Sequence, residues 1–281
     1  MSRLKLHLLN LFLLTSIGIF VFLQLAFKKV DHSLTTSKSE LQLGEKFPKK
    51  SFWFGNKAVS PSIAILILAG HADSQGIEGA GTSGEAVDLN GLPPMDANIS
   101  DELFWNLKVC SAVVKLGKEQ GLNISFYDPG VRTIVDANNL HTNWSVGAIH
   151  ARKGGYPLEI HFDSYGHHGF GSGLIPPISP RMNNIDESLA RNFGRYPLFF
   201  RGGLGGPRRQ IRLLEIGKLE GALENSLRDT NTREATIQAI AERVVNAISW
   251  GVNQKNLFNP KRPKGDIFHL TPDLETIPEA L

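Results

Sequence analysis

The chain has 281 residues, of which 41% are hydrophobic and 20% charged, a composition typical of a globular protein with one substantial core. A formal charge of +3 gives no indication of nucleic-acid binding, and a single cysteine, Cys110, excludes an internal disulfide. We therefore expect a globular protein with no nucleic-acid partner.

An apolar run occupies residues 8–27, with basic residues on both sides. As a helix it would reach about 30 Å, the thickness of the hydrocarbon core of a bilayer. A cleavable signal peptide has a shorter apolar core and a small-residue cleavage site, which Leu25-Ala26-Phe27 matches poorly. Of the two interpretations, anchor or signal, residues 1–29 favour an uncleaved membrane anchor. The basic residues on both flanks leave its orientation open.

Composition divides the rest of the chain into three parts. Residues 30–61 are polar, rich in Ser, Thr and Lys, and indicate a tether. Residues 62–252 combine apolar runs with turn-forming residues and should form the globular domain. Residues 253–281 are rich in Asn, Pro and acidic residues and are expected to form a loosely packed tail.

The globular part opens with an apolar run, residues 63–69, that ends in Gly70-His71. Such a run, too short to span a membrane, predicts a strand buried on both faces, as in a parallel sheet. Ligands of such sheets bind at the carboxyl ends of the strands. We therefore expect Gly70 to form a tight turn and His71 to point into that crevice.

A long loop rich in Gly, Asp and Asn covers residues 72–100, and a helix is expected to follow as far as about residue 120. Ser100 or Asp101 would cap this helix, and Gly121 would end it. Glu102 lies in its first turn, where the helix dipole favours a carboxylate even without a function.

Further strands are expected at residues 122–127, 156–162 and 210–216, and further helices at residues 131–138 and 233–250. The second of these strands carries His161, and the third ends in Glu215 before Gly217. Alternating strands and helices predict an α/β fold with a mostly parallel, mixed sheet between two helical layers.

Three strand ends thus offer His71, His161 and Glu215, and a helix start offers Glu102. Two histidines and a carboxylate with an open fourth position form a catalytic zinc site. A further glutamate can then act as a general base. The sequence therefore predicts zinc bound by His71, Glu102 and His161, with Glu215 as the catalytic residue.

The four local motifs, in this order, resemble the zinc-dependent N-acetylmuramoyl-L-alanine amidases that cut peptidoglycan. They are Leu-Ala-Gly-His71, Glu102 four residues before Asn106-Leu107, Glu-Ile-His161, and Leu-Leu-Glu215-Ile-Gly217. The resemblance covers roughly residues 63–252. Departures from the family pattern lie beside the histidines, where Asp73 and Asp163 stand and where either could orient an imidazole.

Glu85 is an alternative to Glu102 as the carboxylate ligand, because its separation from His71 along the sequence is closer to the separation usual in the amidase family. Gly91 and Pro93-Pro94, however, prevent a long helix from starting at Glu85, so we favour Glu102.

The resemblance implies hydrolysis of the amide between N-acetylmuramic acid and L-alanine, with peptidoglycan as the partner and the domain outside the cytoplasmic membrane. Basic residues such as Arg132, Arg152, Arg201 and Arg208 could meet the carboxylates of this polymer, although a solvated surface position is the more usual role for any single arginine. Two alternatives stay open, a zinc amidohydrolase of small acylated amino acids and a non-catalytic wall-binding or regulatory protein. The sequence does not indicate whether a protein activator is needed.

Overall fold

The computed structural model describes residues 53–254 apart from Glu78. The expected anchor, most of the expected tether and nearly all of the expected tail lie outside these residues. Within the described part of the chain, no helix combines the length and the apolar character that crossing a membrane requires. Trp53, which the sequence places in the tether, is buried, and its indole nitrogen donates a hydrogen bond to the Tyr196 carbonyl at 2.7 Å. The chain is therefore already packed against the domain before residue 62.

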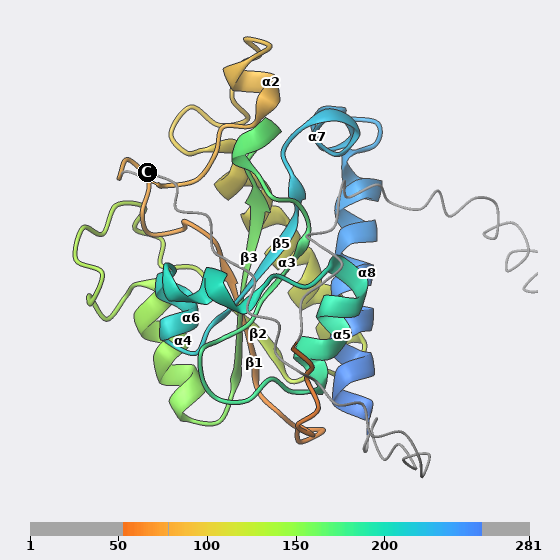
Figure 1. The fold of residues 1–281 in the computed structure, drawn as a ribbon. Helices are drawn as coiled ribbons and strands as arrows, with labels where there is room; N and C mark the ends of the chain where they lie inside the picture. The colour runs from red at the N-terminus through yellow and green to blue at the C-terminus, as the bar shows by residue number, and fades with distance from the viewer. Residues whose placement is uncertain (1–52, 78, 255–281) are drawn as a thin grey trace, which may run out of the picture.

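Five strands form one mixed sheet in the order β2-β1-β3-β5-β4 (Figure 1). They are β1 (Ile65–Ala69), β2 (Ile124–Tyr127), β3 (Tyr156–Asp163), β4 (Gly173–Ile175) and β5 (Arg212–Lys218). The four strands β2, β1, β3 and β5 run parallel, and β4 pairs antiparallel with β5 at the edge. The predicted α/β class with a mostly parallel, mixed sheet is confirmed.

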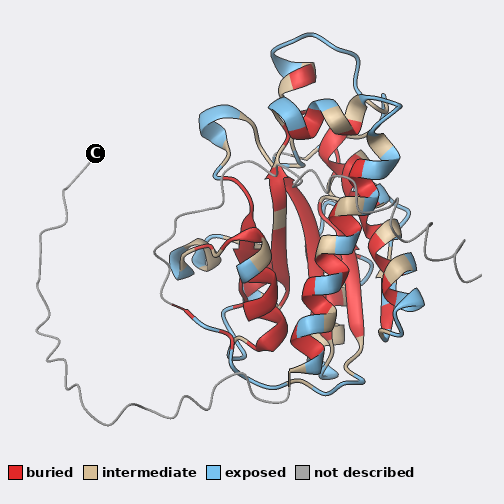
Figure 2. Ribbon diagram, turned by 90° about the vertical axis from the view of Figure 1, so that its right-hand side faces the viewer, coloured by how far each residue is buried: buried red, intermediate tan, exposed pale blue. Residues whose placement is uncertain are grey.

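Helices cover both faces of the sheet, as the two perpendicular views show (Figures 1 and 2). One face carries α3 (Asp101–Glu119), α5 (Asn184–Phe193) and α8 (Arg233–Asn253), and the other carries α4 (Asn143–Arg152) and α6 (Gly205–Arg208). The short helix α2 (Glu85–Asp88) packs against α7 (Gly221–Arg228), and 3-10 turns lie at Gly166–His168 and Leu198–Gly202. The parallel strands therefore lie between two layers of helices.

The central strands are apolar because both of their faces are covered. All five residues of β1 are buried, and seven of the eight residues of β3 are buried (Figure 2). Two apolar clusters result, a large one under α3, α5 and α8 and a smaller one under α4 and α6. Polar side chains on these strands are consequently exceptional, and His161, Glu159 and Glu215 are among them.

The predicted helix at residues 131–138 is wrong. This segment instead pairs with the loop after β1, through a bridge between Ser74 and Thr133 and a hydrogen bond from the Ile134 amide to the Asp73 carbonyl. Its β-branched residues fit extended backbone better than helix. The helical crossover lies later, in α4, where the Thr142 hydroxyl caps the first turn by accepting from the Ser145 amide.

Candidate metal centre

The expected turn at Gly70 is present directly after β1, where the Ala72 amide donates to the Ala69 carbonyl at 3.2 Å. His71 is the next residue of this turn and takes a positive φ of 62°. A close contact gives a second reason for a glycine at position 70. A Cβ at position 70 would lie 2.4 Å from the His161 ring, closer than real contacts allow. The Asn106 amide also donates to the Gly70 carbonyl at 3.1 Å, which ties this turn to α3. The turn therefore places the two histidines beside each other.

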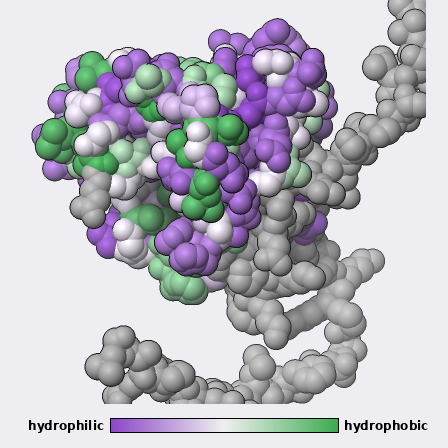
Figure 3. All heavy atoms as spheres, turned by 90° about the horizontal axis from the view of Figure 1, so that it is seen from above, coloured by the Kyte–Doolittle hydropathy of each residue, from purple (hydrophilic) through white to green (hydrophobic). Residues whose placement is uncertain are grey.

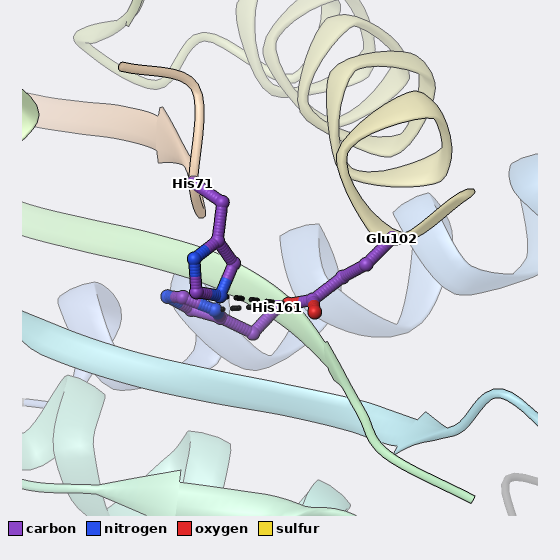
Figure 4. Close-up of side chains that lie close together, drawn as sticks. All are labelled: His71, Glu102 and His161. Carbon is purple, nitrogen blue, oxygen red and sulfur yellow. Dashed lines mark hydrogen bonds and ion pairs between the residues drawn. The ribbon is translucent and has the colours of Figure 1, made fainter. Parts of the chain in front are cut away.

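His161 and Glu102 reach the same point from β3 and from the first turn of α3 (Figure 4). Ser100 caps α3 by accepting from the Leu103 amide, as the sequence predicted. Glu102 is 4% exposed, and its second carboxylate oxygen accepts from the Thr82 amide at 2.9 Å. The carboxylate is thus fixed, with Oε1 directed at the imidazoles.

One oxygen, Glu102 Oε1, lies 3.3 Å from His71 Nε2 and 3.1 Å from His161 Nδ1 (Figure 4). The two imidazole rings stand edge to face with centroids 4.9 Å apart. A set of three ligand atoms, one from each residue, falls within 4.8 Å. The structure therefore brings together the three residues that the sequence selected as metal ligands.

The spacing of these atoms fits zinc. Zinc binds imidazole nitrogen and carboxylate oxygen at about 2.0–2.2 Å in a tetrahedron, which sets neighbouring ligand atoms about 3.3 Å apart. The two nitrogen–oxygen distances, 3.3 and 3.1 Å, agree with that edge. Two nitrogens and one oxygen are also a donor set that catalytic zinc sites use.

The ionisable groups of the cluster depend strongly on one another. Burial alone would raise the pKa of Glu102, but the imidazoles of His71 and His161 hold that pKa well below its usual range. Burial alone would lower the pKa of His161, but its hydrogen bond to Glu102 raises that pKa well above the usual range. In the folded protein, the Glu102 carboxylate is therefore strongly favoured.

Glu215 lies on β5 directly opposite His161 in the strand register. Burial raises the pKa of its carboxyl group to about 8, although the neighbouring His161 opposes the shift. Its Oε2 atom is buried and has no hydrogen-bond partner within the described residues. The side chain that the sequence proposed as general base is thus next to the cluster but outside the set of candidate ligands.

The rival carboxylate, Glu85, lies at the start of α2 and accepts a hydrogen bond from the Gly221 amide at 2.9 Å. It is not a member of the clustered group. The position of the two carboxylates agrees with the choice of Glu102.

Asp73 and Asp163, considered as partners for the imidazoles, instead accept hydrogen bonds from backbone amides, those of Asn143 and of Phe170 and Gly171. The carboxylate beside a ligand is Glu159, whose Oε1 lies 3.9 Å from His161 Nε2. Sequence reasoning missed it, although a charged residue within an apolar strand is an unusual feature that signals its position.

A cavity of about 380 Å³ adjoins the cluster and includes His71 and His161 in its walls. Its other walls come from the loop after β1, the segment around Ile134 and the turn around Gly205. A larger hollow, about 470 Å³, is lined by other residues near the starts of the strands and contains none of the candidate ligands. Seen from above, the molecule is largely hydrophilic, with separate hydrophobic patches (Figure 3).

None of the four arginines expected to meet substrate lines the cavity beside the cluster. Arg132 forms an ion pair with Asp128 at 2.5 Å, and Arg201 donates to the Pro177 carbonyl at 2.8 Å. Arg208 donates to the Gly202 carbonyl.

Comparison with family models gives no match, and no curated protein matches this sequence. Among solved structures, several N-acetylmuramoyl-L-alanine amidases are similar. The catalytic domain of CwlV from Bacillus (Paenibacillus) polymyxa var. colistinus is 16% identical, with a TM-score of 0.44 over 68% of this chain and 96% of that one. AmiC2 of Nostoc punctiforme is 14% identical, with a TM-score of 0.38 over 66% and 94%.

A third similar structure is the CwlD amidase from Clostridioides difficile in complex with the GerS lipoprotein, 14% identical, with a TM-score of 0.40 over 67% of this chain and 96% of that one. The amidases that the sequence motifs resemble are thus the class to which these structures belong. Because the TM-scores lie below 0.5, the functional conclusion rests on the motifs and on the geometry of the site.

Proposed function

We propose that His71, Glu102 and His161 bind one zinc ion and that the domain is an amide hydrolase. One observation carries this proposal. Three ligand atoms from three separate elements lie within 4.8 Å of one another, at the end of the sheet where ligands of parallel strands bind. Two imidazole nitrogens and one carboxylate oxygen that lie this close together form a donor set that suits a metal ion.

When bound, zinc would supply a Lewis acid that polarises the amide carbonyl and lowers the pKa of water. The protein's own residues would carry out the proton transfers. Glu215 lies opposite His161 on the neighbouring strand β5. It would take a proton from the attacking water and deliver one to the departing amine.

The substrate that we propose is the amide between N-acetylmuramic acid and L-alanine of peptidoglycan. The ordered set of four motifs supports this choice, and all four key residues are present. The two alternatives are a hydrolase of small acylated amino acids and a non-catalytic wall-binding protein. One assay distinguishes both of them from the proposed amidase by its outcome.

The assay uses the full chain, purified in detergent and supplied with zinc, and isolated peptidoglycan. We expect new L-alanine amino termini to appear and their release to stop when a chelator removes the metal. N-acetyl-L-alanine, tested in parallel, should be cleaved much more slowly. Binding of peptidoglycan without any release of amino termini would contradict the proposed activity and favour the regulatory alternative. Faster cleavage of the small substrate would favour the other.

We also propose that the domain lies outside the cytoplasmic membrane, anchored by residues 1–29. The wall substrate requires this side, and the apolar run 8–27 has the length of a spanning helix. Protease added to intact spheroplasts should degrade the domain and leave cytoplasmic proteins whole. A domain that stays protected until the membrane is dissolved would place it inside and remove its access to the wall.

A further inference from the structure

The two ends of the parallel sheet differ in charge. The chain before β1 and before β3 lies at the lower end of the molecule in Figure 1, and the segments that follow these strands lie at the upper end, near α2 and α7. At the upper end, the segment after β1, residues 70–100, contains five acidic residues and no lysine or arginine. At the lower end, segments 54–64 and 152–155 contain three basic residues and no acidic residue. The candidate metal centre therefore lies at the acidic end.

The larger hollow, of about 470 Å³, lies at the basic end. Its lining has no acidic residue and includes Lys57, Lys153, Arg181 and Arg212. Arg212 is buried and pairs with Asp186 at 2.9 Å, so its charge is balanced within the protein. The other three are exposed, and none of them belongs to a salt bridge among the described residues. Three positive charges around one hollow, without a counter-charge there, favour an anionic ligand.

The chain connects this hollow to the expected membrane anchor. Residues 57–60 and 62–64 line the hollow, and Trp53, four residues before Lys57, is packed on the domain. Only residues 30–52 separate Trp53 from the expected anchor, and a flexible tether of 23 residues has an end-to-end distance of about 25–30 Å. The hollow would thus be held close to a membrane surface, where binding is intramolecular and the effective concentration is high.

We propose that the basic end of the domain docks on the membrane, with Lys57, Lys153 and Arg181 around the phosphate of an anionic phospholipid headgroup. The inference rests on the proposed anchoring and adds an orientation that the anchor alone does not give. An anionic surface attracts the basic end and repels the acidic end. The starts of the parallel strands would face the bilayer, and the candidate zinc ligands would face away from it, toward the wall.

The test uses the full chain reconstituted into vesicles of phosphatidylcholine, with or without phosphatidylglycerol. A fluorophore is attached at Ala58→Cys, an exposed position in the lining of the hollow, or at Asn90→Cys, an exposed position beside α2. The natural Cys110 is buried and should not be labelled. A lipid with a quencher on its headgroup reports contact. We expect quenching at position 58 and not at position 90, and only when phosphatidylglycerol is present.

The variant Lys57→Gln/Lys153→Gln removes two of the three charges. Because each basic residue near an anionic membrane contributes about fivefold, the ratio of docked to free domains should fall about 25-fold. The matched control is Lys108→Gln/Lys115→Gln, which changes two exposed lysines of α3 that do not line the hollow. It should be quenched as the wild type is. An equal loss in the two variants, or unchanged quenching in Lys57→Gln/Lys153→Gln, would overturn the inference.

Flotation of the same vesicles separates this inference from the proposed anchor. A chain that floats with both kinds of vesicle but shows no quenching at position 58, or equal quenching at positions 58 and 90, would contradict only the docked orientation. A chain that floats only with phosphatidylglycerol and is quenched at position 58 would support docking and contradict the anchor. Binding of soluble glycerol phosphate without quenching in vesicles would assign the hollow to a soluble anion and overturn the docking.

Discussion

Replacing Glu215 by glutamine is expected to lower the release of L-alanine amino termini from peptidoglycan by about 10²–10⁴-fold, the usual effect of losing a general base. Glutamine keeps the shape of the side chain but cannot accept a proton. Glu215 is outside the set of clustered ligand atoms, so the variant should fold and retain zinc. Rates are measured at matched zinc content, with circular dichroism as the check on folding.

Glu242→Gln is a suitable control, because Glu242 is an exposed residue on α8 and belongs neither to the clustered group nor to the cavity lining. It should cleave at the wild-type rate. A Glu215→Gln variant that also cleaves at near the wild-type rate would rule out Glu215 as the base. Loss of zinc from that variant would instead assign Glu215 to the metal.

Removing a candidate ligand should have an equally large effect on metal affinity. Loss of an outer-shell partner typically lowers metal affinity about 10–100-fold, and loss of one of three direct ligands should exceed that. We therefore expect His161→Ala and Glu102→Ala to purify without zinc and to show no activity. Zinc per chain, determined by plasma mass spectrometry after dialysis against a weak chelator, measures the effect.

Glu85→Ala is the matched control for Glu102→Ala. Glu85 accepts a hydrogen bond from the Gly221 amide and is not a member of the group of candidate ligands. This variant should therefore retain its zinc. The opposite pattern, with zinc kept by Glu102→Ala and lost by Glu85→Ala, would show that the carboxylate ligand has been assigned to the wrong residue.

The parts of the site that the sequence predicted are those with strong local signals. Continuous apolar runs marked β1, β3 and β5. The candidate residues His161 and Glu215 lie within β3 and β5, and His71 lies two residues after β1. Ser100 marked the start of α3 and so the place of Glu102. Because parallel strands end at one edge of a sheet, these signals were enough to bring His71, His161 and Glu102 together.

The parts that the sequence did not predict depend on contacts between distant segments. Thr133 and Ile134 pair with the loop after β1, and although their β-branched side chains agree with extended backbone, the sequence does not reveal which distant segment they pair with. Strand β4 has only three residues and pairs at the edge. Gly70 carries no signal beyond that of a turn residue, yet its role is set by the His161 ring from another strand. The surroundings of Glu159 are set by residues on other elements, since Asn143 donates a hydrogen bond to it and Gly206 lies beside it.

X-ray absorption at the zinc edge, on the full wild-type chain, tests the central claim most directly. We expect about one zinc per chain, with nitrogen and oxygen neighbours at about 2.0–2.2 Å and no sulfur neighbour. The only cysteine, Cys110, is buried on α3 and does not belong to the clustered group. A chain that purifies without metal and cannot be loaded with zinc, or a spectrum with sulfur at about 2.3 Å, would contradict the assignment of His71, Glu102 and His161 as the zinc ligands.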